Sequence, residues 1–496
     1  MRRGKTIVAN TLESEESRVA VLDPSGRLLD IYIERMWERQ KAGEIYKARV
    51  DNVLPGMNAA FVNLGDGRNG FLYLEDLGRS PHPGEEILVQ VAKTARKGKG
   101  ARVTPKLSLP GRYLVLVPEG KDVGVSKRIE DEEERQRLKV LGREVRPQGF
   151  GIIVRTVAQG CHMDQLKSDV EDLMDLWDSI CAAASRSPAP CLLYRDRGLL
   201  DRVLRDELDH QVAEVVVDNP EELDLVREMV GRFFSQGKGP EVTLYRGRTP
   251  VFEVYGVERE MELALERKVW LPSGAYLVID QAEALTVIDV NTGKFTGSKD
   301  LKSTILKTNL EAAEEIARQL RLRAIGGIVV VDFIDMDDES HRQILLETTR
   351  ELLKGDRQRA KVFGVTSLGL VELTRRRTRG DLKSVMTRGC PMCGGSGLVE
   401  REDACAMRLK RAVRKMTGDS PPEALLVAAN PQLARHCAEY LPAWEEEFRC
   451  RILLREDQSL QWGRFKVEHQ GALRQAEHRM RSVEGGTSVV HRTDRA

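Results

Sequence analysis

The apolar strand patterns 285–289 and 328–332, which both end in an aspartate, are the feature that most constrains this chain. Residues 276–280 and 285–289 follow strand patterns and are separated by four residues, so they predict a hairpin. Apolar residues at a helical period follow over residues 299–323, and the apolar strand 328–332 comes next. The sequence therefore predicts a hairpin, a crossover helix and a further buried strand.

Asp289 and Asp332 lie at the downstream ends of their strands, where an open α/β sheet places its ligand crevice. Converging carboxylates are hard oxygen ligands that suit Mg²⁺, and a bound ion of this kind can activate water for attack on phosphorus. Asn291 would face the same crevice. A single aspartate at a strand end is more often a cap or turn former, but two in matching positions favour a shared metal. Asp335, Asp337 and Asp338 lie just beyond and better fit a solvated loop with a helix cap, with contact between one of them and the metal as the alternative.

Composition indicates a globular protein of several domains. The chain has 496 residues, 41% of them hydrophobic, and no apolar run near the roughly 18–20 residues that a membrane span needs. Its start leads into a strand pattern and not into a signal-peptide core, so we expect a cytoplasmic location. The net charge of +1 means that a polyanion would be bound by local basic patches.

The eight cysteines are scattered except for Cys390 and Cys393, a distribution that argues against a disulfide framework. These two thiols, followed by a glycine-rich turn, can hold one half of a tetrahedral zinc site. A redox Cys-x-x-Cys motif or an empty turn is the alternative. The remaining zinc ligands would come from another subunit or from candidates further along the chain, which are Cys405, His436, Cys437 and Cys450.

Short strand patterns recur between residues 44 and 104 and predict a small inserted β-barrel. Phe61 and Phe71 lie on neighbouring patterns. Aromatic rings with nearby cations suit single-stranded RNA, because bases stack on rings while lysines and arginines follow the phosphates. Taken singly, a phenylalanine in a small barrel more often packs in the core. The cations that crowd a nearby loop are Lys93, Arg96, Lys97, Lys99 and Arg102.

Two further motifs carry weaker signals. Residues 151–156 offer an arginine fork, a hydroxyl and backbone donors at a strand end, the groups that bind a phosphate, although most such pairs are surface residues. A basic run over 375–377, continued by Arg379, Lys383 and Arg388, is typical of a solvated helix face. Beside a phosphodiester site it could instead hold the backbone or the transition-state charge.

Three segments, residues 276–293, 309–323 and 328–336, resemble the catalytic core of the ribonuclease E/G family. The resemblance implies a magnesium-dependent endoribonuclease that cuts single-stranded RNA, both rRNA precursors and mRNA, and leaves 5′-phosphate and 3′-hydroxyl ends. It also implies a DNase I-like catalytic subdomain in which Asp289 and Asp332 bind Mg²⁺ and Asn291 helps to place the ion or its water.

The same resemblance implies other contacts with RNA. Residues 45–50 through 70–72 look like the family's OB-fold, with Phe61, Phe71 and Lys99 as RNA contacts. Arg155 and Thr156 match a motif that binds the 5′-monophosphate of the substrate. Arg128 resembles a further contributor to that pocket, which would favour 5′-monophosphorylated RNA.

The resemblance also implies an α+β multidomain architecture and its order. An RNase H-like fold, split between residues 1–36 and 200–266, would enclose the OB-fold at 37–104 and a 5′-sensor at 105–199. A catalytic subdomain at 267–385, a zinc link at 386–400, a small C-terminal α/β domain at 401–485 and a disordered tail at 486–496 would follow.

The family resemblance favours another subunit as the source of the missing zinc ligands. Two chains would share one structural zinc through Cys390 and Cys393, giving a homodimer that could pair further into a homotetramer. We expect the architecture of the shorter, G-type members, with no degradosome scaffold tail. At Ser367 the chain departs from the family pattern, which carries a basic residue there, so that RNA contact is in doubt.

Two other classes of function stay open at this point. A non-catalytic RNA-binding protein would use the same barrel and basic runs, but it would give no magnesium-dependent products. A metal-dependent phosphodiesterase acting on DNA or a small nucleotide would have no use for an aromatic and basic barrel.

Overall fold

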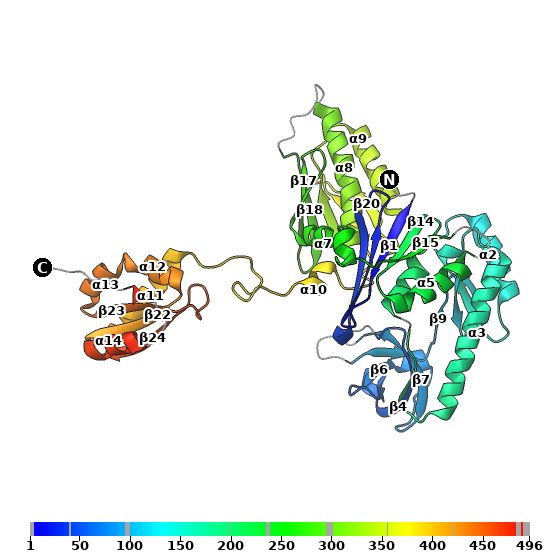
Figure 1. Cartoon of the computed structure of the whole chain (residues 1–496), viewed down its shortest axis with the longest axis horizontal. Coiled ribbons are helices and arrows are strands. Elements are labelled where there is room, and N and C mark those ends of the chain that lie inside the picture. Colours follow the sequence, from blue (N-terminus) through cyan, green and yellow to red (C-terminus); the bar gives the residue numbers. More distant parts are fainter. Residues whose placement is uncertain are drawn as a thin grey trace. The chain divides into compact units, whose positions relative to one another are not determined.

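The computed structural model describes residues 4–38, 41–94, 100–196, 198–234, 239–293, 301–354, 356–418, 420–482 and 488–489 (Figure 1). The chain divides into two compact units, Met1–Val385 and Met386–Ala496. The expected RNA contact Lys99 and most of the expected disordered tail lie outside the described residues. No helix among the described residues is long and apolar enough to cross a membrane.

The first sheet joins strands from two distant parts of the chain. The strands β1, β2 and β3 form an antiparallel meander, and β14 pairs in parallel with β1. Apolar residues alternate between the two faces, so that Ile7 and Val215 pack under one group of helices while Val8 and Val216 pack under another. The sheet runs in the order β15 (Glu241–Leu244), β14 (Val212–Val217), β1 (Lys5–Asn10), β2 (Glu16–Leu22) and β3 (Leu28–Arg35). Its helices are α4 (Leu199–Glu207), α5 (Pro220–Phe233), α6 (Val251–Val254) and α7 (Val257–Leu265).

The predicted small β-barrel is confirmed. Its five strands close because β4 pairs with both β5 and β7, and β13 (Cys191–Tyr194) adds to the outside of β4. Val50, Val62 and Leu72 fill the interior. The barrel strands, in spatial order, are β4 (Ile45–Leu54), β5 (Ala59–Asn63), β6 (Gly70–Tyr73), β8 (Arg102–Thr104) and β7 (Glu86–Lys93), with the short helix α1 (Leu74–Leu77) after β6.

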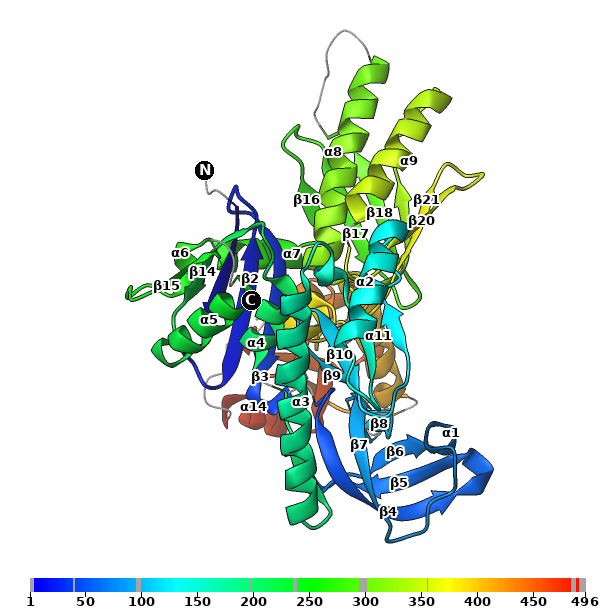
Figure 2. The same cartoon turned by 90° about the vertical axis from the view of Figure 1, so that its right-hand side faces the viewer.

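A separate four-stranded sheet carries the motif at residues 151–156. The long helix α3 packs with α2 against this sheet (Figure 2). The elements are β9 (Leu109–Pro110), β10 (Leu114–Val117), β11 (Val123–Val125), α2 (Glu132–Val145), β12 (Gly151–Val154) and α3 (Met163–Arg186). Short 3-10 turns lie at Met36–Glu38, Pro55–Met57 and Thr156–Ala158.

A six-stranded sheet, which we call the catalytic sheet, holds the paired aspartates. The predicted hairpin and the parallel strand after the crossover helix are confirmed as β17, β18 and β19. Figures 1 and 2 show α8 and α9 side by side against one face of this sheet. The sheet order is β16 (Lys268–Trp270), β17 (Tyr276–Gln281), β18 (Leu285–Asn291), β19 (Gly327–Asp332), β21 (Val371–Arg375) and β20 (Lys361–Val365), with α8 (Leu301–Leu322) and α9 (Glu339–Lys354).

The strand β19 differs from the fully buried strand that its apolar sequence predicts. Val329 and Val331 face the helices and are buried, whereas Ile328 is 50% exposed. The reason is that α8 and α9 cover only one face of the catalytic sheet. The other face, which we call the open face, is where Asp289 and Asp332 are exposed.

The basic run that begins at residues 375–377 does not form a solvated helix face, which corrects that expectation. Arg375 ends strand β21 and is only 3% exposed, because the inward positions of that strand are Val371, Leu373 and Arg375. Its guanidinium donates to the carboxylate of Asp356, to the Ile325 carbonyl at 2.7 Å and to Gln358 Oε1 at 2.8 Å. This arginine is therefore part of the interior.

The second unit contains a four-stranded sheet with helices around an apolar core. Strands β22 and β23 are parallel, and β24 lies antiparallel to β22. Its elements are α11 (Glu402–Thr417), β22 (Ala424–Ala429), α12 (Pro431–Ala438), α13 (Leu441–Phe448), β23 (Arg451–Glu456), β24 (Phe465–Gly471), α14 (Leu473–Ser482) and β25 (Ser488–Val489). The short helix α10 (Leu382–Met386) ends at the division between the two units.

We predict that Asp356→Ala destabilises the first unit by about 3–5 kcal/mol, because it leaves the buried Arg375 cation without its carboxylate. Urea unfolding followed by circular dichroism would measure the change. Glu351→Ala is the matched control, since it removes an exposed pair with Lys354 on α9 and should barely move the midpoint. Equal midpoints for the two variants would contradict a structural role for the buried pair.

Candidate active site

The parallel pairing of β18 and β19 places Asp289 directly beside Asp332. Neighbouring strands run about 4.8 Å apart, and register partners in a parallel pair point to the same side of the sheet. The flanking residues Ile288, Val290 and Val331 are buried on the other side, so alternation turns both carboxylates onto the open face. Two acidic side chains that lie far apart in the chain are thus brought together.

The electrostatics of this pair favour a cation. Partial burial, and then the negative charges of Asp289 and Asp335, raise the pKa of the Asp332 carboxyl. Asn291 Nδ2 donates to Asp289 Oδ2 at 2.7 Å and so fixes the direction of that carboxylate. Mg²⁺ is usually bound by one or two carboxylates with waters and substrate phosphates completing its shell, and this donor set fits it. Within the described ranges, no group of three or more acidic, histidine or cysteine side chains gathers to hold a metal.

Asn309 is a positioning residue that the strand pattern did not single out. It is fully buried on α8, where its Nδ2 donates to the Ile334 carbonyl at 2.8 Å and its Oδ1 accepts from the Ile334 amide at 3.0 Å. These two bonds hold the loop that follows Asp332. The sequence signal that could have identified it was an asparagine at an apolar position of the helical pattern, because a polar side chain buried there needs hydrogen-bond partners.

Phe61 and Phe71 lie outside the barrel core, on its surface. They are register partners on β5 and β6, and their ring centroids are 5.8 Å apart in an edge-to-face arrangement. Tyr73 extends the cluster at 4.9 Å from Phe71, and the Arg102 guanidinium lies 4.6 Å from the Tyr73 ring. Sequence reasoning missed Tyr73, although its alternation with Phe71 on β6 placed it on the same face. The barrel therefore presents neighbouring rings and a cation on one surface.

The residues of the predicted phosphate-binding motif lie near one another, and further arginines that were not predicted lie close to them. Arg155 Nη1 donates to the Gly111 carbonyl at 2.7 Å, and the Thr156 hydroxyl lies 2.9 Å from that of Ser126. Burial, and then the positive charges of Arg359 and Arg357, lower the pKa of Arg128. The charge of Arg155 contributes in the same direction. The contribution of these neighbouring cations indicates a cluster suited to an anion, and Arg357 and Arg359 were not predicted.

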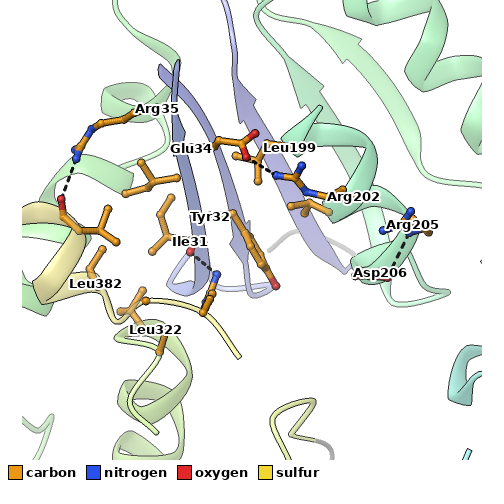
Figure 3. Close-up of a pocket in the computed structure, with 16 residues that line it drawn as sticks. Ile31, Tyr32, Glu34, Arg35, Leu199, Arg202, Arg205, Asp206, Leu322 and Leu382 are labelled. Atoms are coloured by element: carbon orange, nitrogen blue, oxygen red, sulfur yellow. Dashed lines mark hydrogen bonds and ion pairs between the residues drawn. The ribbon is translucent and has the colours of Figure 1, made fainter. Parts of the chain in front are cut away.

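A pocket of about 290 Å³ has Asp206 among its lining residues, and neither of the paired carboxylates lines it (Figure 3). Strand β3, helix α4 and the segment 379–385 line it, with Glu34 paired to Arg202 at 2.9 Å. Asp206 connects the pocket to the phosphate motif, because its carboxylate accepts from Arg155. The larger lining side chains are Ile31, Tyr32, Leu199, Arg205, Leu322, Arg379 and Leu382.

Cys390 is exposed and Cys393 is partly exposed, in the turn where the sequence predicts half of a zinc site. The Gly397 amide lies 3.3 Å from Cys393 Sγ, and backbone hydrogen bonds from Gly397 and Gly395 lower the pKa of that thiol. The other candidate ligands of the second unit have other surroundings: three cysteines are packed in its core, and His436 bonds to Asp403 at 3.0 Å. These core cysteines are Cys405, Cys437 and Cys450.

Comparison with known proteins agrees with the resemblance. A model of the ribonuclease E/G family matches residues 108–378, more than half of the chain. The chain is 40% identical to ribonuclease G of Escherichia coli (strain K12) over 445 residues, covering 84% of this chain and 89% of that protein. It is 37% identical to ribonuclease G of Haemophilus influenzae over 441 residues, covering 85% and 89%. It is 36% identical to ribonuclease E of Escherichia coli (strain K12) over 429 residues, covering 83% of this chain and 40% of that longer protein.

The family match spans the phosphate motif and the catalytic sheet, including Asp289, Asn291 and Asp332. The relatives extend the similarity over most of the remaining chain. The chain belongs to the ribonuclease E/G family.

Proposed function

We propose that this endoribonuclease cuts single-stranded RNA at the open face of the catalytic sheet, with Mg²⁺ held by Asp289 and Asp332. The observation that carries the proposal is the register pairing of these carboxylates on adjacent parallel strands. Partial burial and the charge of Asp289 raise the pKa of Asp332, and a divalent cation would relieve the repulsion between the two carboxylates. The names of the relatives, ribonuclease G and ribonuclease E, support RNA as the substrate. We propose that precursors of rRNA and mRNA are the RNAs that it cuts.

The residues of this chain would act mainly by positioning. Asn291 orients Asp289, and Asn309 holds the loop after Asp332, so that both carboxylates meet the substrate already in place. A bound Mg²⁺ would supply Lewis-acid stabilisation of the scissile phosphate and lower the pKa of a water. In-line hydrolysis would leave a 5′-phosphate and a 3′-hydroxyl. We propose that this subdomain has the DNase I-like fold of the family.

We predict that Asp289→Asn and Asp332→Asn each abolish cleavage while leaving RNA affinity within a few-fold, because metal binding needs the charge and RNA binding is supplied elsewhere. Cleavage of a short single-stranded RNA, with binding measured in parallel, would test this. Asp280→Asn is the control, since Asp280 lies on the same sheet but pairs with Arg267 and not with the two carboxylates. Full activity in either active-site variant would defeat the mechanism.

The barrel would bind a part of the RNA other than the part at the catalytic sheet. We propose that it is the family's OB-fold and that Phe61, Phe71 and Lys99 contact the RNA. The edge-to-face rings of Phe61 and Phe71, with Tyr73 and Arg102 beside them, support stacking of successive bases and contact with the phosphates. We further propose that the first sheet is the split RNase H-like domain, which carries the barrel as an insertion.

The 5′ end of the RNA would be held by the arginine cluster. We propose that Arg128, Arg155 and Thr156 bind a 5′-monophosphate and that Arg359 adds its charge to the pocket. A monophosphate fits a compact set of donors, while a triphosphate would bring further charge that needs further donors. This would make the enzyme prefer RNA that is already cut.

We predict that Arg155→Ala removes the preference for 5′-monophosphorylated RNA, lowering its cleavage rate roughly ten- to hundredfold through loss of charge-assisted hydrogen bonds. Matched 5′-monophosphorylated and 5′-hydroxyl RNAs of one sequence would measure the preference as a ratio of kcat/KM. Arg143→Ala, at an exposed position of α2, should keep the ratio of the unaltered protein. An unchanged ratio in Arg155→Ala would argue against this pocket.

The turn that contains Cys390 and Cys393 would join two chains. We propose that Cys390 and Cys393 supply half of a tetrahedral zinc site and that the same pair of a second copy supplies the rest, forming a homodimer. Two observations support this: the Cys393 thiol has a lowered pKa, and the other cysteines of this unit are packed in its core.

We predict one zinc for every two chains, and we expect Cys390→Ser and Cys393→Ser to lose both the zinc and the dimer. Metal analysis combined with light scattering would measure the two together. Cys181→Ser, on α3 in the other unit, should change neither quantity. One zinc per chain in a monomeric protein would overturn the shared site.

A further inference from the structure

An aromatic and cationic cluster lies on the open face at the β16 edge of the catalytic sheet. Trp270 and Tyr276 are register partners on β16 and β17, with ring centroids 5.2 Å apart and ring planes at 60°. Lys268 Nζ lies 3.9 Å from the Trp270 ring centroid and 3.5 Å from that of Tyr276. The Trp270 side chain is nevertheless 62% exposed, so a large part of its indole is open to solvent.

This cluster shares two rows of the sheet with the candidate active site. Tyr276 pairs with Asn291, and Val278 pairs with both Lys268 and Asp289. Because adjacent register partners point to the same side, these side chains lie on the same open face as the carboxylates. Strands about 4.8 Å apart place Trp270 roughly 10 Å across the sheet from the β18 row. That separation suits a nucleotide next to the one being cut.

We propose that Lys268, Trp270 and Tyr276 form a base-stacking subsite for a nucleotide that flanks the scissile phosphate. The inference rests on the proposed function and adds a second place, besides the barrel, where RNA is held. An exposed indole offers a stacking surface to any base, and the Lys268 ammonium lies where a phosphate of the same strand can reach it. The subsite would therefore select unpaired RNA without selecting a sequence.

A protein partner fits this surface less well than RNA does. A stable interface buries about 800 Å² on each partner, and a patch of that size centred on Trp270 would extend over Asp289 and Asp332. It would also bury the Lys268 ammonium, which has no carboxylate within salt-bridge distance among the described residues. A phosphate of RNA would neutralise that charge, and one RNA strand can cross the open face without covering the two carboxylates.

Binding is best measured in an Asp332→Asn background, where RNA is held but not cut. A short single-stranded RNA is titrated while tryptophan fluorescence is followed. We expect Trp270→Ala to weaken binding roughly 5- to 150-fold, the effect of one stacked base, and to remove part of the quenching. Trp270→Phe should restore most of the affinity. Trp37→Ala, which removes another exposed tryptophan, is the control.

An abasic scan identifies the nucleotide. Single abasic sites are placed one at a time on each side of the scissile bond, and each RNA is bound to the background protein and to its Trp270→Ala variant. At one position the losses from the missing base and from the missing indole should not add, because both remove the same contact. Additive losses at every position would overturn the subsite.

The outcomes separate this inference from the proposed function. If the unaltered protein cuts RNA but Trp270→Ala binds it equally well, only the subsite fails. If the unaltered protein does not cut RNA, the proposed function fails while the binding and quenching data still decide the subsite. If Trp270→Ala dissociates the protein into smaller species with unchanged RNA affinity, the surface is a protein interface and the subsite is overturned.

Discussion

The parallel pairing of β18 with β19 is the constraint on which the rest of the site depends. A parallel pair cannot be closed by a tight turn, so the chain must cross over, and α8 makes that crossing. The helix then covers one face of the catalytic sheet with Ala313, Ile316 and Leu320. Covering one face and leaving the other open is what turns Asp289 and Asp332 outward together. The same packing that buries the apolar side of the sheet therefore creates its acidic side.

A network of buried charges holds this sheet against the first one. Asp30 on β3 accepts from Arg321 at 3.0 Å, and Glu207 on α4 accepts from Arg321 at 3.2 Å and from Arg357 at 2.6 Å. Burial lowers the pKa of Arg321, but Asp30 and Glu207 outweigh it and raise the pKa overall. Arg357 also lies near Arg128 in the phosphate cluster. The contacts that fix the two sheets thus fix the arginines that would receive a 5′ end.

Patterns within a few residues of one another in the sequence predict the features of the site that depend on single strands. Strand alternation and strand ends were enough to place Asp289 beside Asp332, and alternation on β21 could have shown that Arg375 points inward. The approach of Arg359 to Arg128 could not be predicted in this way, because more than 200 residues separate them and only tertiary packing joins their elements. The same limit applies to the Trp270 surface, since the exposure of its ring depends on which face of the sheet the helices cover.

The negative charges that would bind the metal and the positive charges that would bind RNA must lie at different places on the surface. Two carboxylates on an open face repel the phosphates of RNA until a cation neutralises them. With a net charge of +1, the chain has no general attraction for a polyanion. On the proposals above, affinity would come from separate cations around the acidic centre, which are Arg102 on the barrel, Arg128 in the arginine cluster and Lys268 on the sheet. Since each of these lies on a different element, RNA bound to all three would be held at several points, and the geometry of the fold would position the scissile bond between them.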